Sequence, residues 1–220
     1  MNAIIGFAEI LNNQYFGELN ERQSEYSKGI IDASSRLLAL INDILDLAMI
    51  EAGRMTLERN RVDAHALLVS VFNLTRDWAR KQNLKLEFRC PPDIGVMTAD
   101  ERRIKQALFN LMSNAIKYTP EGGRVSLIGR REAATVVFEV ADSGVGIPRE
   151  DRTRIFEKFE RGPQPEGGMT GAGLGLALVK NFVEMHGGYV EIDSSPERGT
   201  RVSCVLPAHA DPGNAIAEAS

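Results

Sequence analysis

The apolar stripe of one long helical segment is the feature that most limits how this chain can fold. From Glu21 to about Ala52, apolar side chains recur at helical spacing, three residues wide per heptad. The stripe comprises Ile30, Ile31, Leu37, Leu38, Ile41, Ile44, Leu45 and Ala48. A shorter helix over Met1–Asn13 precedes it, and two antiparallel helices alone cannot bury a stripe of this width. We therefore expect a hairpin that pairs with a second copy in a four-helix bundle; packing against the rest of the chain is the alternative.

A change of pattern after Gly53 predicts a second, different domain. Helices and paired strands alternate there without a regular strand–helix–strand rhythm, which favours an α/β sandwich with a mixed sheet. The expected helices cover Asp63–Lys81, Asp100–Tyr118 and Gly173–His186. The expected strands cover Met55–Arg59, Leu84–Cys90, Gly95–Thr98, Arg124–Arg131, Thr135–Ala141, Tyr189–Asp193 and Thr200–Leu206. The predicted division is a helical hairpin over residues 1–53, an α/β domain over 54–207 and a disordered tail over 208–220.

Composition narrows the classes of function. The net charge of −4 argues against a general nucleic-acid binder. Cys90 and Cys204 lie far apart and form no metal-like cluster, so both are interpreted as buried thiols in a reducing compartment. No apolar run reaches the ~18 residues of a membrane helix. The segment is expected to be cytoplasmic, with any membrane anchor in regions of a longer parent protein.

A row of amides on one predicted helix is the first candidate site. Gln106, Asn110 and Asn114 lie one turn apart on one face of the helix, with Lys117 beside them. Amide oxygens suit Mg²⁺, which takes its other ligands from water and substrate phosphates. A solvated polar stripe is the alternative, and the motif alone leaves the two interpretations even.

Two glycine-rich turns are further candidates. Asp142 ends a predicted strand and precedes Gly144 and Gly146, so its carboxylate can accept from an exocyclic amine while the backbone approaches a flat ring. A tight turn is the alternative. The run Gly171–Leu176 opens a helix whose N-terminus favours a phosphate.

The segment between these turns contains two positively charged residues, Lys158 and Arg161, whose role the sequence leaves open. Arg161–Thr170 is rich in glycine and proline and predicts a mobile loop. Lys158 and Arg161 stand at its start, where they either face phosphate or belong to local surface packing.

The order of the motifs carries more information than any one of them. An asparagine box, Asp-x-Gly-x-Gly, Phe-x-x-Phe, Gly-x-Gly-Leu-Gly-Leu and Gly-Thr follow one another between Gln106 and Thr200. This order resembles the Bergerat, or GHKL, ATP-binding fold of histidine kinases, type II topoisomerases, mismatch-repair ATPases and Hsp90 chaperones, over Met55 to Pro207. Asn110 stands where the hydrolysing branches carry a glutamate base, and an amide cannot take a proton from water. With the junction Leu45–Gly53, the chain therefore resembles a bacterial two-component sensor histidine kinase.

The resemblance implies a role for each motif residue. Asp142 would bind the adenine amine of ATP, Tyr118 and Ile147 would flank the ring, and Thr200 would support it. Mg²⁺ would be held by Asn110 and Asn114. Phosphate charge would be offset by Lys117, Lys158 and Arg161, and backbone N–H groups around Gly173–Gly175 would cradle the phosphates. The full implied ATP-binding set is Asn110, Asn114, Lys117, Tyr118, Asp142, Gly144, Gly146, Ile147, Lys158, Arg161, Gly171, Gly173, Leu174, Gly175, Leu176 and Thr200.

One departure from the family concerns the phosphoacceptor histidine. In the family it lies just before the residues that match Met1 and Asn2, so this chain does not include it, and the hairpin is expected to be truncated. His65, His186 and His209 are expected to have ordinary structural roles. The resemblance therefore implies a core that binds Mg-ATP but cannot phosphorylate itself.

The resemblance also implies partners and leaves alternatives open. A homodimer through the hairpin and a response regulator receiver domain are the implied partners. A degenerate kinase that binds nucleotide and a response regulator as a scaffold, without phosphotransfer, is the alternative. A GHKL ATPase is a third option, disfavoured by Asn110 and by the bundle helices.

Overall fold

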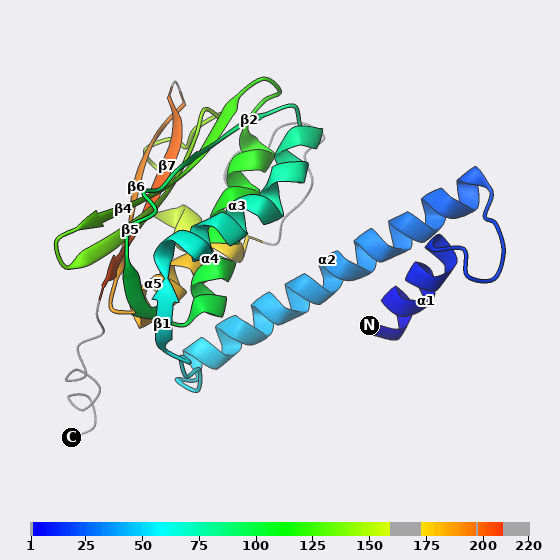
Figure 1. Ribbon diagram of the computed structural model, residues 1–220, viewed down its shortest axis with the longest axis horizontal. Coiled ribbons are helices and arrows are strands. Elements are labelled where there is room, and N and C mark those ends of the chain that lie inside the picture. The colour runs from blue at the N-terminus through cyan, green and yellow to red at the C-terminus, as the bar shows by residue number, and fades with distance from the viewer. Residues whose placement is uncertain (1, 159–172, 197, 209–220) are drawn as a thin grey trace. The chain divides into compact units, whose positions relative to one another are not determined.

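Two compact units make up the chain, residues 1–55 and 56–220, in a computed structural model that describes residues 2–158, 173–196 and 198–208 (Figure 1). The first unit contains helix α1 (Asn2–Asn12) and helix α2 (Glu21–Glu51). Asn20 and Gln23 start α2 with reciprocal side-chain to backbone bonds, a capping box. The buried Ser27 hydroxyl donates to the Ala8 carbonyl at 2.7 Å and so ties the two helices together.

The apolar stripe of α2 remains largely exposed in the described chain. Ile30, Ile44 and Leu45 are 46%, 45% and 56% exposed, and Phe7 on α1 is 69% exposed. As expected from its width, the hairpin does not bury its own stripe.

A five-stranded mixed sheet organises the second unit, in the order β2-β4-β5-β7-β6. Strand β2 (Lys85–Arg89) runs parallel to β4 (Arg124–Glu132). The other neighbours are antiparallel: β5 (Thr135–Asp142), β7 (Gly199–Pro207) and β6 (Tyr189–Ser195). Helices α3 (Ala64–Lys81), α4 (Glu101–Tyr118) and α5 (Gly175–Met185) cover one face of this sheet (Figure 1). The predicted α/β sandwich with a mixed sheet is confirmed.

Helix α4 shows how local sequence places the helical layer. The Asp100 side chain accepts from the Arg103 N–H and caps the helix. Its apolar face, with Ile104 and Leu108 almost fully buried, packs in the core with Phe138 of the sheet. The amide row on the opposite side is consequently left facing away from the core.

One predicted strand is absent, and one predicted helix starts later than expected. Residues 55–59 form no strand; β1 is Asn60–Asp63, paired antiparallel with β3 (Val96–Ala99). The alternation at 55–59 has no partner strand, because the residues that pair with β3 follow it. Helix α5 starts at Gly175 rather than Gly173, since Gly173 has φ +73°, outside the right-handed helical region. A short 3₁₀ turn, η1 (Arg154–Phe156), precedes the undescribed residues 159–172.

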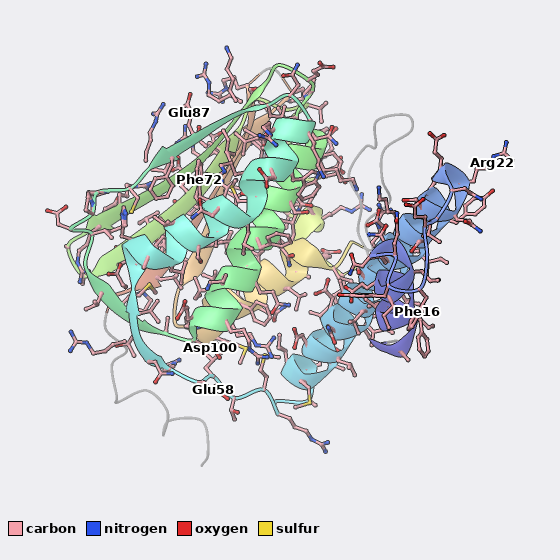
Figure 2. All side chains as sticks on the ribbon, turned by 45° about the vertical axis from the view of Figure 1, so that its right-hand side comes forward. Phe16, Arg22, Glu58, Phe72, Glu87 and Asp100 are labelled. Atoms are coloured by element: carbon pink, nitrogen blue, oxygen red, sulfur yellow. The ribbon has the colours of Figure 1, made fainter. Side chains whose placement is uncertain are left out.

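A cluster of hydrogen bonds joins the start of α4 to the end of α5. The Asp100 N–H donates to Nε2 of the buried His186 at 2.9 Å. The Asp100 carboxylate also accepts from the Glu58 N–H at 3.0 Å, and Figure 2 shows these two residues at the same end of the unit. The Arg59 guanidinium donates to the Met185 carbonyl at 2.8 Å. We call these residues the clasp.

The expected tail begins one residue too early. Ala208 is fully buried, its N–H donates to Ala134 O at 2.8 Å, and its carbonyl accepts from the Thr98 N–H at 3.1 Å. Residues 209–220 of the predicted tail lie outside the described residues. Of the helices described, none combines the length and the apolar character needed to cross a bilayer.

Candidate functional site

The polar row of α4 leads to the first turn of α5. Asn110, Asn114 and Lys117 are half-buried on the face of α4 opposite its core residues. The Asn110 side-chain amine lies 3.4 Å from the Gly175 carbonyl at the start of α5. Two segments far apart in sequence are thus brought together at this end of the row.

The N-terminus of α5 differs from those of the other helices in the sandwich. Asp63 caps α3 and Asp100 caps α4, whereas Leu174 at the corresponding position of α5 provides no side-chain cap. The first N–H groups of a helix have no intrahelical acceptor and carry partial positive charge. An anion is therefore a suitable partner for this terminus, where Gly175 and Leu176 form the first turn.

A second cluster forms where β5 and β7 end side by side. Asp142 pairs with Thr200 across the two strands. Its Oδ1 accepts from the Gly144 N–H at 2.8 Å and from the Thr200 N–H at 3.2 Å. Burial raises the pKa of Asp142, while these two N–H groups oppose the increase. Oδ2 accepts no hydrogen bond in the part of the chain described, so one carboxylate oxygen is available to a ligand.

Gly144 and Gly146 pack against neighbouring backbone too closely for any side chain. A Cβ at Gly144 would overlap the Tyr118 carbonyl oxygen at the end of α4, and one at Gly146 would overlap that of Ser195 at the end of β6. Gly146 also has φ +66°. The turn after Asp142 is thus held against both α4 and the sheet.

Ser194 is a member of this cluster that the sequence reasoning missed. Its hydroxyl lies 2.9 Å from the Thr200 hydroxyl and accepts from the Ile147 N–H at 2.8 Å. A single buried serine in strand β6 carries no motif. Its only signal is a polar side chain at a core-facing strand position, and pairing with Thr200 across β6 and β7 was needed to find it.

The two clusters are joined through the end of α4. Tyr118 accepts from the Val145 N–H through its carbonyl at 3.3 Å, and the Lys117 ammonium lies 4.9 Å from the centre of the Tyr118 ring. The described candidate residues therefore line a continuous path from Asp142 along α4 to Gly175. Lys158 follows η1 with an exposed side chain, and Arg161 and Gly171 lie outside the described residues.

Comparisons with known proteins agree with this geometry. Residues 99–210 match the family described as "Histidine kinase-, DNA gyrase B-, and HSP90-like ATPase", and residues 1–53 match the "His Kinase A (phospho-acceptor) domain". The chain is 39% identical over 207 residues to the histidine protein kinase DivJ of Caulobacter vibrioides, covering 94% of this chain and 35% of DivJ. It is 38% identical to the circadian input-output histidine kinase CikA of Synechococcus elongatus, covering 94% of this chain and 28% of CikA.

Solved structures give the same result. Full-length ShkA in complex with AMPPNP superposes with a TM-score of 0.76 at 31% identity, over 96% of this chain and 44% of ShkA. Histidine kinase ThkA in complex with the response regulator protein TrrA superposes with a TM-score of 0.66 at 26% identity, over 94% of this chain and 57% of that chain.

The site and fold define a GHKL-type ATPase domain preceded by a histidine-kinase helical domain. The chain belongs to the sensor histidine kinase family. It spans about a third of the length of the curated relatives it matches.

Proposed function

We propose that the second unit binds Mg-ATP as the catalytic core of a two-component kinase. In this proposal the γ-phosphate is transferred to a histidine outside this sequence and then to a response regulator. The observation that carries the proposal is the Asp142 carboxylate. Two backbone N–H groups hold one of its oxygens, and the other is available for the adenine amine.

The rest of the path suits the remaining parts of ATP. The glycine turn of Gly144 and Gly146 is held close to α4 and the sheet, with Tyr118 and Ile147 on its two sides as proposed contacts of the flat base. The uncapped start of α5 is suited to phosphate oxygens. Thr200 and Ser194 support Asp142 and the turn rather than contacting phosphate.

The amides of α4 fit a magnesium site. Asn110 uses its amine toward the Gly175 carbonyl, which leaves its oxygen as a neutral, hard ligand, and Asn114 lies one turn further along the same face. When bound, Mg²⁺ would supply positive charge that neutralises the phosphates. Asn110 and Asn114 would orient the phosphate chain along α4, with Lys117 adding positive charge.

This residue set favours transfer over hydrolysis. Asn110 cannot accept a proton from water, so the site offers no general base at that position. Both ring nitrogens of the buried His186 have backbone partners, so it is not available as a nucleophile. The proposed nucleophile is an acceptor histidine that lies outside this sequence, just before α1, in a homodimer formed through α1 and α2.

Calorimetry and radiolabelling test this function together. Mg-ATP is expected to bind the chain, and Asn114→Ala is expected to abolish the Mg²⁺-dependent part of the affinity. Asn73→Ala, at an exposed position of α3, is the matched control and should leave it unchanged. With γ-labelled ATP this chain should acquire no stable label, whereas a parent protein with the upstream histidine should. Steady ATP hydrolysis by this chain would contradict the proposal, and nucleotide binding with an unlabelled parent would favour the scaffold alternative.

A further inference from the structure

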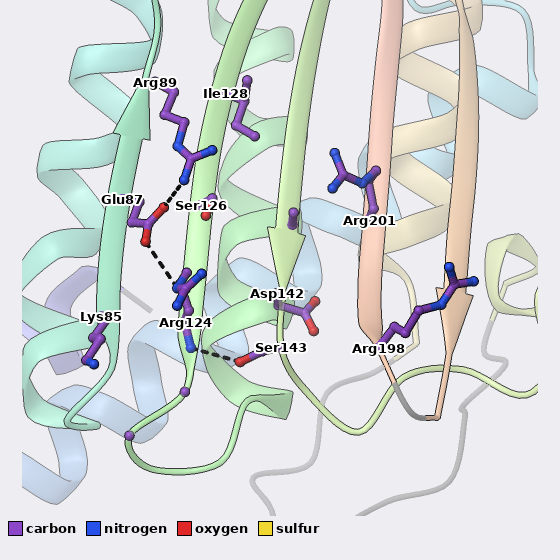
Figure 3. A pocket seen from close by; sticks show the side chains of 13 residues that line it. Lys85, Glu87, Arg89, Arg124, Ser126, Ile128, Asp142, Ser143, Arg198 and Arg201 are labelled. Carbon is purple, nitrogen blue, oxygen red and sulfur yellow. Dashed lines mark hydrogen bonds and ion pairs between the residues drawn. The ribbon is translucent and has the colours of Figure 1, made fainter.

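A cavity of about 410 Å³ lies on the face of the sheet that the helices do not cover (Figure 3). Strands β2, β4, β5 and β7 form its floor. One cross-strand row runs through Glu87, Ser126, Ala141 and Arg201, since each is paired with the next. Its volume falls in the range of small-molecule sites.

The cavity is strongly cationic although the chain as a whole is anionic. Five cationic side chains and two carboxylates line it, a local charge of +3, against a net charge of −4 for the chain. The cations are Lys85, Arg89, Arg124, Arg198 and Arg201. A small anion is therefore attracted to this cavity although the net charge of the chain is negative.

Glu87, one of the two carboxylates that line the cavity, leaves most of the donors of its two arginine partners unused. Glu87 accepts from Arg89 at 2.6 Å and from Arg124 at 3.1 Å, one contact to each guanidinium. Each guanidinium has five N–H donors in a planar fork. Glu87 thus orients two arginines without satisfying them, while Lys85 adds a compact charge at the same end of β2.

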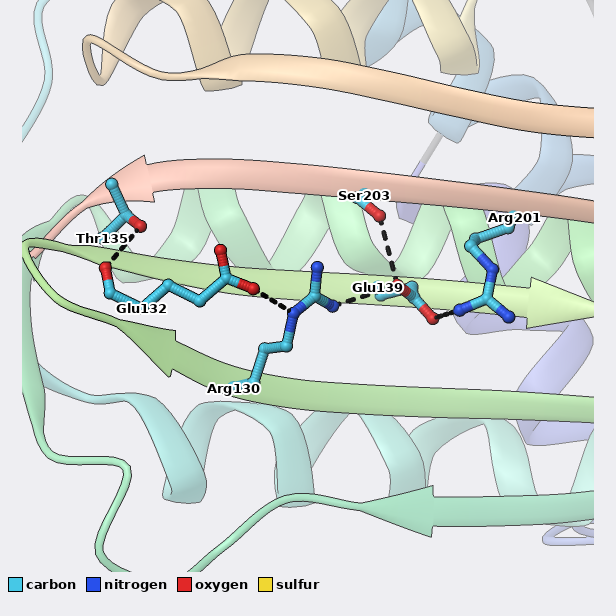
Figure 4. Close-up of polar contacts among 6 residues, drawn as sticks. All are labelled: Arg130, Glu132, Thr135, Glu139, Arg201 and Ser203. Atoms are coloured by element: carbon cyan, nitrogen blue, oxygen red, sulfur yellow. Dashed lines mark hydrogen bonds and ion pairs between the residues drawn. The ribbon is translucent and has the colours of Figure 1, made fainter.

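Arg201 is positioned by a second carboxylate outside the cavity. Glu139 lies on the same face, its side chain only 4% exposed, and it accepts from Arg201, from Arg130 at 3.0 Å and from the Ser203 hydroxyl at 3.3 Å (Figure 4). The buried Glu139 accepts hydrogen bonds on both oxygens, and its bond from Nη1 of Arg201 holds that guanidinium at the cavity edge.

We propose that this cavity is a second binding site, for a small phosphate-bearing anion, which adjoins the nucleotide site at Asp142. Planar guanidinium forks match the oxygens of phosphate in paired hydrogen bonds, and four of them line a space of suitable size. The Ser126 hydroxyl on the floor adds a donor. The cavity adjoins the proposed nucleotide site, because Asp142 is also one of its lining residues, while the neighbouring pair Ala141 and Arg201 belongs to the cavity floor.

Titration of the labelled chain with inorganic pyrophosphate, followed by amide NMR shifts, tests the proposal. The amides of Ser126, Ser143 and Arg201 are expected to shift together and saturate in the range of about 1 mM or below. Arg124→Gln should weaken this binding at least about tenfold, because it removes one guanidinium fork. Arg76→Gln, an exposed position on α3 with the same change in charge, is the control and should leave the affinity unchanged.

The residue-resolved readout separates this site from the nucleotide site. Saturable shifts at the cavity that persist with ADP present, and that only Arg124→Gln weakens, support the proposal. Shifts confined to Leu174 and Gly175, equal weakening by both arginine variants, or no saturation would overturn it. The result does not depend on whether the chain binds ATP.

Discussion

Replacing Asp142 by asparagine should reverse the base preference of the proposed site. The Asp142 Oδ1 accepts from two backbone N–H groups, Gly144 and Thr200, at 2.8 and 3.2 Å. In Asp142→Asn the amide oxygen should keep these two bonds, because an amine there would face two donors. The amide NH₂ must then occupy the place of Oδ2, where the proposed adenine amine is also a donor.

The loss of ATP affinity can be estimated from the replacement of an acceptor oxygen by a donor NH₂ group. A hydrogen bond to a charged group contributes about 1.5 to 3 kcal/mol, and two facing donors leave the adenine amine unpaired. We expect ATP to bind about 2 to 3 kcal/mol more weakly, or about 30- to 150-fold. Inosine triphosphate carries an oxygen acceptor in place of the amine, so the same substitution should strengthen its binding relative to ATP.

Calorimetry with both nucleotides, alongside urea unfolding, checks this reasoning. Burial raises the pKa of Asp142, so its charge is less favourable in the folded protein, and the neutral amide should leave stability unchanged or increase it. Equal weakening of both nucleotides would refute the donor exchange. Binding of ATP within about threefold of the original affinity would refute the role of Asp142 itself.

Three further outcomes follow from buried or strained positions. Gly199→Ala should lower the free energy of unfolding by about 2 kcal/mol or more, because Gly199 has φ +81° and a Cβ would overlap the Asp142 carbonyl; an unchanged urea midpoint would contradict this. Burial lowers the pKa of His186 below 6.5, so its stabilising contribution is present above pH 6.5 and lost as pH falls through the folded pKa. In His186→Gln the glutamine can still accept from the Asp100 N–H, so the free energy of unfolding measured in urea should depend less on pH below 6.5 than in the original protein. An identical pH dependence in both proteins would argue against this role of His186. Burial raises the pKa of Cys204 to about 12, so a thiol reagent should modify Cys204 at pH 8 only after unfolding, and fast modification of Cys204 itself in the folded protein would exclude this burial.

Local chemistry allowed the helices of the sandwich to be predicted well. Asp63 and Asp100 were expected to start their helices, and both side chains cap them. The 3.6-residue period also separated the amide row of α4 from its buried face, on which Ile104 and Leu108 lie. The order of motifs along the chain predicted the fold class that the sheet and helices show.

Positions that depend on distant backbone partners could not be read in this way. Residues 55–59 alternate like a strand, yet β3 pairs with the following residues. Ala208 looked like tail sequence and is buried because Ala134 and Thr98 bond its backbone. Ser194 carries no local signal, since its role exists only beside Thr200. The roles of the individual ATP-binding residues remain predictions.

The clasp has a mechanical consequence. Residues 58 and 59 are bonded to the start of α4 and the end of α5, while Tyr118 and Gly175 lie at the opposite ends of these helices. A pulling force applied at residue 56 would therefore load hydrogen bonds of Glu58 and Arg59 before it reached the sheet. While these bonds hold, tension on the segment before residue 56 does not reach the ends of α4 and α5 that are proposed to hold nucleotide. Tension reaches those ends only after the clasp breaks.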